Sequence, residues 1–344
     1  MTQPIIIDTH THTRASDGTF TPEESVAYAA SVGLEVIAKT DHDTTFGNDQ
    51  AIAAGQKYGV KVIPGIEIDA IYNHQNSDAK VKGLELLGLN INSEKIQPFE
   101  EKIQGVRRYV VDFAINAYNE YISSDSFSKE NQNKAYPLVN PKAISIDTLI
   151  KEHNDKMQFE NPNPFLSKGS VIGHIAKNYL EQNADVEQLI ERNYAQENAF
   201  KNEYMFMFAS YVQKVNFHEA IDAVHEAGGK AVIAHPGRHL GYNHGMLKEW
   251  ELPKSDWFKE NDQLTPYAFI SDLVNHGLDG IEQYYYAESD AKHGPQQDLI
   301  NEYFIAIAEK LDLMVTYGSD CHGEKNGKPR LGQFGGTYNY SHLL

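Results

Sequence analysis

Two histidines stand two residues apart at the end of an apolar run near the N-terminus. The run Ile5–Ile7 leads into Asp8, His10 and His12. Alternate residues of an extended chain face the same side, so these three side chains share one face of a predicted strand. Two imidazoles held at that spacing on a rigid strand are suited to bind one divalent metal ion. Metal binding is therefore the first chemistry that the sequence predicts.

Further apolar runs along the chain also end in, or carry, side chains that bind metals. These runs and their polar residues are 36–40 with Asp41, His42 and Asp43; 60–66 with Glu67; 84–89 with Glu85; 231–234 with His235 and Arg238; and 313–319 with Asp320 and His322. Ligands that converge from several strands indicate a multinuclear centre, which is a pattern of enzymes. The run 280–286 shows no clear ligand, and we expect its three tyrosines to form wall or core.

Helix signals separate the predicted strands. Thr21 with Glu24 forms a capping box that has Pro22 at the first helical position. Asn216 and Glu219 repeat the cap before the next helical segment. Strands that alternate with helices predict a mostly parallel α/β sheet. Barrel enzymes of this class keep their active sites at the carboxyl ends of the strands, where the polar residues lie here.

The middle of the chain differs in character from its two ends. Residues 94–122 and 185–208 have helical patterns, and residues 123–141 are polar and predict a long loop. We expect residues 1–92 and 216–344 to form a barrel, and residues 93–215 to form an inserted, mainly helical cap over its mouth. Such a cap would restrict the size of the substrate.

The ordered motifs resemble those of the polymerase and histidinol phosphatase (PHP) superfamily. The matching segments are Asp8 to His12, Ser16 to Gly18, Thr40 to Asp43, Pro64 to Glu67, Gly173 with His174, Ala234 to Arg238, and Gly318 to His322. They most resemble the bacterial branch that includes nucleotide 3′,5′-bisphosphate phosphatases and 5′-3′ exoribonucleases. The resemblance implies a distorted seven-stranded β/α barrel with two to three divalent ions.

The resemblance also implies which residues bind these ions. The implied ligands are His10, His12, Glu67 and Asp320 for the first ion; Glu67 and His235 for the second; and Asp17, His42 and His322 for the third. The branch usually has a further histidine at the second ion, where this chain has Glu85. A carboxylate there favours manganese or iron over zinc, because it is a harder donor and adds negative charge. Two alternatives stay open: His74 is the ligand, or the second site is weak.

The remaining implied roles concern the substrate and the catalytic set. Arg238 is expected to hold a phosphate group through its guanidinium. His174 resembles the substrate-side histidine of the family, and Lys177 or Lys168 would replace an arginine that the branch places shortly before it. The implied catalytic residues are Glu67, Asp320, His235 and Arg238. Asp8, Asp41 and Asp43 are expected to orient the ligand imidazoles.

Charge and composition limit the partners. The chain carries a formal net charge of -18, which argues against binding of long duplex nucleic acid. Divalent ions would outweigh the carboxylates of the centre, so a small anion such as a nucleotide is still attracted. One cysteine among 344 residues excludes an intramolecular disulfide and fits a reducing compartment. With no leader pattern and no long apolar stretch, we expect a cytoplasmic protein without a membrane span.

The leading functional prediction is a metal-dependent phosphoesterase. We expect it to hydrolyse a phosphomonoester of a small metabolite, above all a nucleoside 3′,5′-bisphosphate, through a hydroxide that bridges two ions of manganese, iron or zinc. The alternatives are a 5′-3′ exonuclease on short single-stranded RNA, a histidinol-phosphate-type phosphatase, and a metal-binding module without catalysis.

Overall fold

The computed structural model describes most of the chain and divides it into two compact units. The described residues are 7–73, 80–158, 160–161, 163–191, 194–208, 215–237, 265–284, 297–323 and 331. One unit comprises Met1–Glu101 and Lys214–Leu344, and the other comprises Lys102–Gln213. We call them the barrel unit and the helical unit. The expected role of residues 93–215 as a cap stays a prediction.

The barrel unit is built on one sheet. Within the described residues it has eight strands, in the order β1-β2-β3-β4-β6-β7-β8 with β5 paired to β3. The strands are β1 (Ile7–Asp8), β2 (Val36–Lys39), β3 (Lys61–Asn73), β4 (Lys80–Leu89), β5 (Val215–Asn216), β6 (Lys230–Ile233), β7 (Gly280–Tyr284) and β8 (Met314–Gly318). The first and last strands of this path also meet, because the Thr9 amide donates to the Tyr317 carbonyl at 2.7 Å and the His12 amide to the Cys321 carbonyl at 2.9 Å. The seven-strand path is therefore a nearly closed barrel, as the sequence predicts.

One strand of the barrel runs against the others. The pairs β1–β2, β2–β3, β6–β7 and β7–β8 are parallel, whereas β4 is antiparallel to both β3 and β6. The cause is the short connection between Asn73 and Lys80, because a parallel pair requires a crossover of a dozen or more residues. The same pairing extends β3 beyond Glu67, so Glu67 lies within a strand and not at its end.

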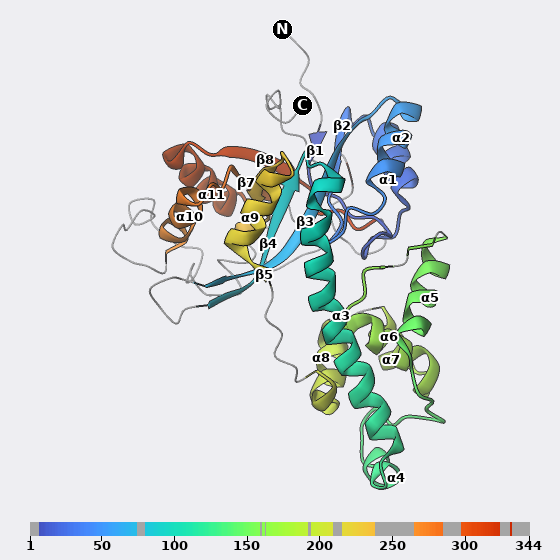
Figure 1. Cartoon of the computed structure of the whole chain (residues 1–344). Helices are drawn as coiled ribbons and strands as arrows, with labels where there is room; N and C mark the ends of the chain where they lie inside the picture. Colours follow the sequence, from blue (N-terminus) through green and yellow to red (C-terminus); the bar gives the residue numbers. More distant parts are fainter. Residues whose placement is uncertain are drawn as a thin grey trace. The chain divides into compact units, whose positions relative to one another are not determined.

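Helices cover the outside of the sheet (Figure 1). They are α1 (Pro22–Ser31), α2 (Asn48–Tyr58), α9 (Phe217–Glu226), α10 (Pro266–Asn275) and α11 (Gln297–Leu311), and α3 (Ser93–Ser123) begins in this unit and continues into the other. Both predicted caps are present. The Glu24 amide donates to Thr21 Oγ1 at 3.2 Å while Glu24 Oε2 accepts from the Thr21 amide at 2.8 Å. Asn216 accepts from the His218 amide at 2.8 Å.

Alternation along the strands separates the barrel interior from its helix-covered outside. Ile7, Val36 and Ala38 belong to the interior cluster, which also includes Leu87 and Tyr317. Ile37, between Val36 and Ala38 on β2, instead packs in the cluster beneath α1 and α2. This period of two fixes which face of each strand reaches the interior, and therefore which polar residues can meet there.

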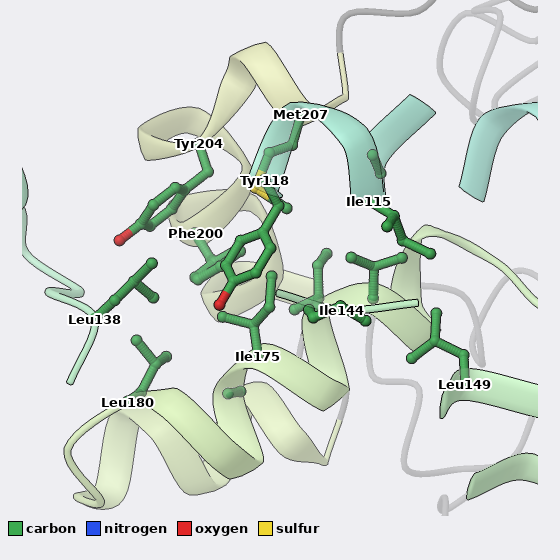
Figure 2. Packing of buried hydrophobic residues seen from close by; sticks show 14 of the residues in the cluster. Ile115, Tyr118, Leu138, Ile144, Leu149, Ile175, Leu180, Phe200, Tyr204 and Met207 are labelled. Carbon is green, nitrogen blue, oxygen red and sulfur yellow. The ribbon is translucent and has the colours of Figure 1, made fainter. Parts of the chain in front are cut away.

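The helical unit has its own hydrophobic core. It contains the rest of α3 with α4 (Phe127–Asn131), α5 (Ile146–Met157), α6 (Lys168–Tyr179), α7 (Ala184–Ile190), α8 (Tyr194–Glu203) and a 3₁₀ turn at Met205–Met207. Figure 2 shows Tyr118, Phe200, Tyr204 and Met207 in this core, and all four are fully buried. The predicted loop at 123–141 is wrong in one part, because residues 127–131 form α4.

Within the part of the chain that the structure describes, no helix combines the length and the apolar composition needed to span a bilayer.

Candidate metal centre

Glu67 lies at the centre of a cluster of imidazoles inside the barrel unit. Its Oε1 lies 3.2 Å from His10 Nε2 and 3.3 Å from His235 Nε2. Its Oε2 lies 3.2 Å from His12 Nε2 and 3.0 Å from His42 Nδ1. The two oxygens therefore face two different pairs of histidines, which come from the ends of β1, β2 and β6.

The predicted first site is assembled around Asp320. Asp320 Oδ1 lies 3.0 Å from His12 Nε2 and 3.6 Å from His10 Nε2, and the two Nε2 atoms lie 3.0 Å apart. Ligand atoms of His10, His12, Glu67 and Asp320 all lie within 4.8 Å of one another, and all four residues are buried. This is the ligand set that the resemblance implies for the first ion.

The predicted third site lies next to it. Asp17 Oδ1 is 3.2 Å from His322 Nε2, and His42 completes a group in which the ligand atoms are within 4.8 Å of one another. His12 belongs to this group as well, because its ligand atom lies within the same 4.8 Å, and its ring stacks on that of His322 with centroids 4.1 Å apart. His12 thus lies between the first and third groups.

The second site contains the carboxylate that departs from the family pattern. Glu85 Oε2 lies 3.3 Å from His235 Nε2, and Glu85 forms a further group with His42 and Glu67. The structure therefore brings Glu85 to the centre, although it lies in the middle of β4 and not at a strand end. The alternative ligand His74 lies outside the described residues, as does Arg238.

Two of the candidate ligands have unusual backbone angles. His235 has φ of 24° and Asp320 has φ of 48°, both in the left-handed region that costs free energy for residues other than glycine. Such strain is found mainly at functional sites, where surrounding contacts hold the backbone in place.

One buried acid at the centre is absent from the predicted ligand set. Glu282 on β7 lies with its carboxylate oxygens 3.0 and 3.1 Å from His10 Nδ1, and its Oε2 accepts from the His235 amide at 2.8 Å. The sequence analysis found no clear ligand in the run 280–286 and did not single out this residue. The available signal was an ionisable side chain inside an apolar run, since burying such a group is costly unless it is paired.

A match to a family model identifies the family of the chain. The PHP domain model matches residues 8–207, which is more than half of the chain. The chain belongs to the PHP family. The match ends before His235 and Asp320, which the barrel brings next to His10, His12 and Glu67.

Relatives and a solved structure agree with the family. The chain is 27% identical to a 5′-3′ exoribonuclease of Haemophilus influenzae, over 92% of this chain and 89% of the relative. It is 26% identical to a phosphoribosyl 1,2-cyclic phosphate 1,2-diphosphodiesterase of Eggerthella lenta, over 95% and 98%. A 3′,5′-nucleoside bisphosphate phosphatase of Chromobacterium violaceum is 34% identical over 25% of this chain and 28% of the relative's length.

The same fold occurs in a candidate metal-dependent phosphoesterase from Bifidobacterium adolescentis. Its structure matches with a TM-score of 0.54 at 23% identity and covers 96% of this chain and 90% of that one. This likeness supports the PHP barrel. The family match and the named relatives identify the chain as an enzyme, a metal-dependent phosphoesterase.

The ionisable groups of this candidate centre favour the binding of cations. Burial by itself would lower the pKa of His42, but Glu67 and Asp17 raise it to about 10. Burial would raise the pKa of Glu67, but His10 and His42 hold it well below its ordinary value. Glu67 is therefore ionised, and divalent ions can supply the positive charge when the imidazoles bind them in neutral form.

The geometry of the centre fits divalent ions. Glu67 is fully buried, and among the described residues neither of its carboxylate oxygens has an aligned hydrogen bond, although imidazole nitrogens lie 3.0–3.3 Å away. His12 Nδ1 is buried and equally lacks one within the same residues. Buried polar atoms are rarely left without a partner, and a shared cation would satisfy these. Imidazole nitrogen and carboxylate oxygen suit manganese, iron and zinc.

Asp41 organises the loop that carries Asp17. It accepts hydrogen bonds from the Thr13 amide at 2.8 Å and hydroxyl at 2.7 Å, and from the Ser16 amide at 2.9 Å and hydroxyl at 2.6 Å. Lys39 Nζ lies 2.8 Å from the same carboxylate, and both side chains are buried. These contacts fix a loop backbone, whereas the sequence led us to expect an orientation of ligand imidazoles.

Asp8 has a comparable place between two strands. Its Oδ1 accepts from the His10 amide at 3.1 Å and the Ser319 amide at 3.0 Å. It therefore joins the segment after β1 to the segment that carries Asp320.

Three of the predicted substrate residues lie in the helical unit. His174 on α6 is buried, and its Nδ1 lies 3.0 Å from Glu152 Oε1. Lys177 on the same helix is exposed. Lys168 Nζ donates to the Phe208 carbonyl at 3.4 Å. Their part in substrate binding stays a prediction.

Proposed function

We propose that this enzyme hydrolyses a phosphomonoester of a small nucleotide, first of all a nucleoside 3′,5′-bisphosphate. The observation that carries the proposal is the position of Glu67. Its Oε1 lies between His10, a candidate ligand of the first ion, and His235, a candidate ligand of the second, so this carboxylate is placed to bridge the two ions, while its Oε2 faces His12 and His42. Paired cations are suited to in-line displacement at phosphorus.

The proposed chemistry divides between bound ions and protein side chains. Bound divalent ions lower the pKa of water and polarise phosphoryl oxygens. His10 and His12 present their Nε2 atoms towards Glu67 and Asp320, so these four residues would fix one ion position. The strand backbone behind them is buried, which keeps the ligands preorganised.

The preference for a small substrate rests on charge. The net charge of -18 opposes a long polyanion, while a cation-loaded centre attracts one or two phosphate groups. Arg238 is the residue proposed to bind a phosphate group through two hydrogen bonds of its guanidinium. For a second phosphate, His174 and Lys177 are the proposed contacts, as the family resemblance implies.

A phosphodiester substrate is the second candidate, and the relatives favour it. Relatives that match along nine-tenths of the chain are named for exoribonuclease and cyclic phosphodiesterase activities, whereas the bisphosphate phosphatase matches along a quarter. We therefore include short single-stranded RNA and phosphoribosyl 1,2-cyclic phosphate as substrates to be tested. The metal centre is the same for both candidates.

The experiment is a substrate panel with protein reconstituted with manganese. The panel holds adenosine 3′,5′-bisphosphate, AMP, histidinol phosphate, phosphoribosyl 1,2-cyclic phosphate and a 5′-phosphorylated short RNA, with Asp320→Asn as the control. Rapid phosphate release from the bisphosphate, lost in the control, is the expected result. Release of mononucleotides from the RNA, or opening of the cyclic diester, would instead support the second candidate, a phosphodiesterase. Turnover of none of these by metal-loaded protein would contradict both.

A further inference from the structure

We infer that Glu282 is a positioning residue that holds two metal ligands at once, through the side chain of His10 and the backbone of His235. The family model ends at residue 207 and so does not cover it. The inference rests on the proposed function, because it takes His10 and His235 as ligands of the first and second ions.

The first contact sets the form of the His10 ring. Glu282 Oε1 lies 3.0 Å from His10 Nδ1, and both side chains are fully buried. An ionised carboxylate can only accept, so His10 carries its proton on Nδ1 and turns the lone pair of Nε2 towards Glu67 and Asp320. A carboxylate behind a histidine in this way fixes the tautomer and raises the basicity of the ligating nitrogen.

The second contact holds a strained backbone. The His235 amide donates to Glu282 Oε2 at 2.8 Å, and His235 has φ of 24°. A residue other than glycine keeps such an angle only where neighbouring contacts over-determine it. The rings of His10 and His235 stack with centroids 5.4 Å apart and planes 20° apart. One carboxylate therefore fixes the relative positions of two candidate ligands, which follow β1 and β6.

The surroundings of Glu282 leave room for this arrangement and for little else. A Cβ atom at Gly318 of β8 would collide with Glu282 Oε1 and with the Cβ atom of His10. Glycine at this position allows the carboxylate and the imidazole to approach across the barrel. The side chain is 1% exposed, so water cannot replace its contacts.

A different role for the same atoms is that Glu282 is itself a ligand. Its carboxylate forms a group with His10 and His235 in which the ligand atoms lie within 4.8 Å of one another. The hydrogen bonds argue against this role. One oxygen is taken by the Nδ1 proton of His10 and the other by a backbone amide, so neither faces an ion.

The test compares two variants of Glu282 with a matched control. Glu282→Gln keeps the shape but replaces one acceptor by a donor, and Glu282→Ala removes both acceptors. Asp279→Asn is the control, because Asp279 directly precedes the same strand and is also a hydrogen-bonded acid. Its partners are His225, Lys230 and the Ala231 amide, none of which is a candidate ligand. Manganese and zinc affinities and stoichiometry are measured by calorimetry and elemental analysis.

We expect both Glu282 variants to bind the first and second ions 10- to 100-fold more weakly. The third site, with Asp17, His42 and His322, should retain its ion, and Asp279→Asn should bind all ions as the wild type does. Wild-type affinities in Glu282→Gln and Glu282→Ala would overturn the inference. Metal binding needs no substrate, so a failed substrate panel and a failed inference are distinguishable.

A measurement on the unaltered protein covers the case in which the variants do not fold. Long-range ¹H–¹⁵N spectra of zinc-loaded protein identify which imidazole nitrogen binds the ion. We expect His10 to bind through Nε2 and to keep a slowly exchanging proton on Nδ1. Coordination through Nδ1 would overturn the inference, since that nitrogen would then not donate to Glu282.

Discussion

Glu85 Oε2 lies 3.3 Å from His235 Nε2, although Glu85 comes from the middle of β4, which is antiparallel to both of its neighbours. The carboxylate that stands in place of the usual histidine thus reaches the centre. Because oxygen is a harder donor than imidazole nitrogen, this exchange bears on which metal the second site prefers.

The first prediction concerns that exchange. Glu85→His should shift the preference from manganese or iron towards zinc, and Glu85→Ala should lose the second ion while the first is retained. Competition between manganese and zinc, followed by elemental analysis, measures this. Metal content and preference identical to the wild type in both variants would remove Glu85 from the ligand set.

The second prediction concerns the buried pair of Lys39 and Asp41. Lys39→Met should lower the free energy of unfolding by roughly 3–5 kcal/mol, because it leaves a buried carboxylate without its cation. It should also weaken the third site, since Asp41 holds the loop next to Asp17. Denaturant unfolding and metal content are the measurements. Lys57→Met, which removes an exposed pair with Glu23, is the control and should cost little.

The third prediction concerns pH. Burial would raise the pKa of Asp279, but its hydrogen bonds with Lys230 Nζ and the Ala231 amide lower it below its ordinary value. A lowered pKa stabilises the fold above the ordinary pKa of an aspartate, and this stabilisation is lost as the pH falls through the lowered value. Asp279→Asn should therefore cost about 1.5–3 kcal/mol near neutrality.

Urea unfolding between pH 7 and pH 3 checks this dependence. The difference in the free energy of unfolding between wild type and Asp279→Asn should shrink towards the acid end. A difference that is constant over the range would show that the charge of Asp279 does not stabilise the barrel.

The sequence predicted those candidate ligands that follow apolar runs at a spacing of two. His10, His12, Asp320 and His322 are read directly from such spacing, because extended strands place alternate residues on one face. Glu282 could not be found in this way. Its partner His10 lies 272 residues away, and the two meet only when the barrel closes.

Strand direction was the other feature that spacing did not reveal. The pattern predicted a mostly parallel sheet, and the short connection after β3 turned β4 against its neighbours. This reversal also explains why Glu67 and Glu85 lie inside long paired strands. By contrast, the lack of β-rich runs in the middle of the chain correctly indicated helices, since the helical period can be recognised within a short stretch of sequence.

The most direct test of the account is Glu67→Gln, measured for metal content and for phosphoester hydrolysis in the same manganese-loaded samples. Glutamine keeps the shape of the side chain but has one oxygen instead of two, so it cannot bridge cations. The account predicts that the variant loses at least one ion per chain and nearly all activity on the substrate found in the panel, while Asp279→Asn retains both. Wild-type metal content and turnover in Glu67→Gln would contradict it.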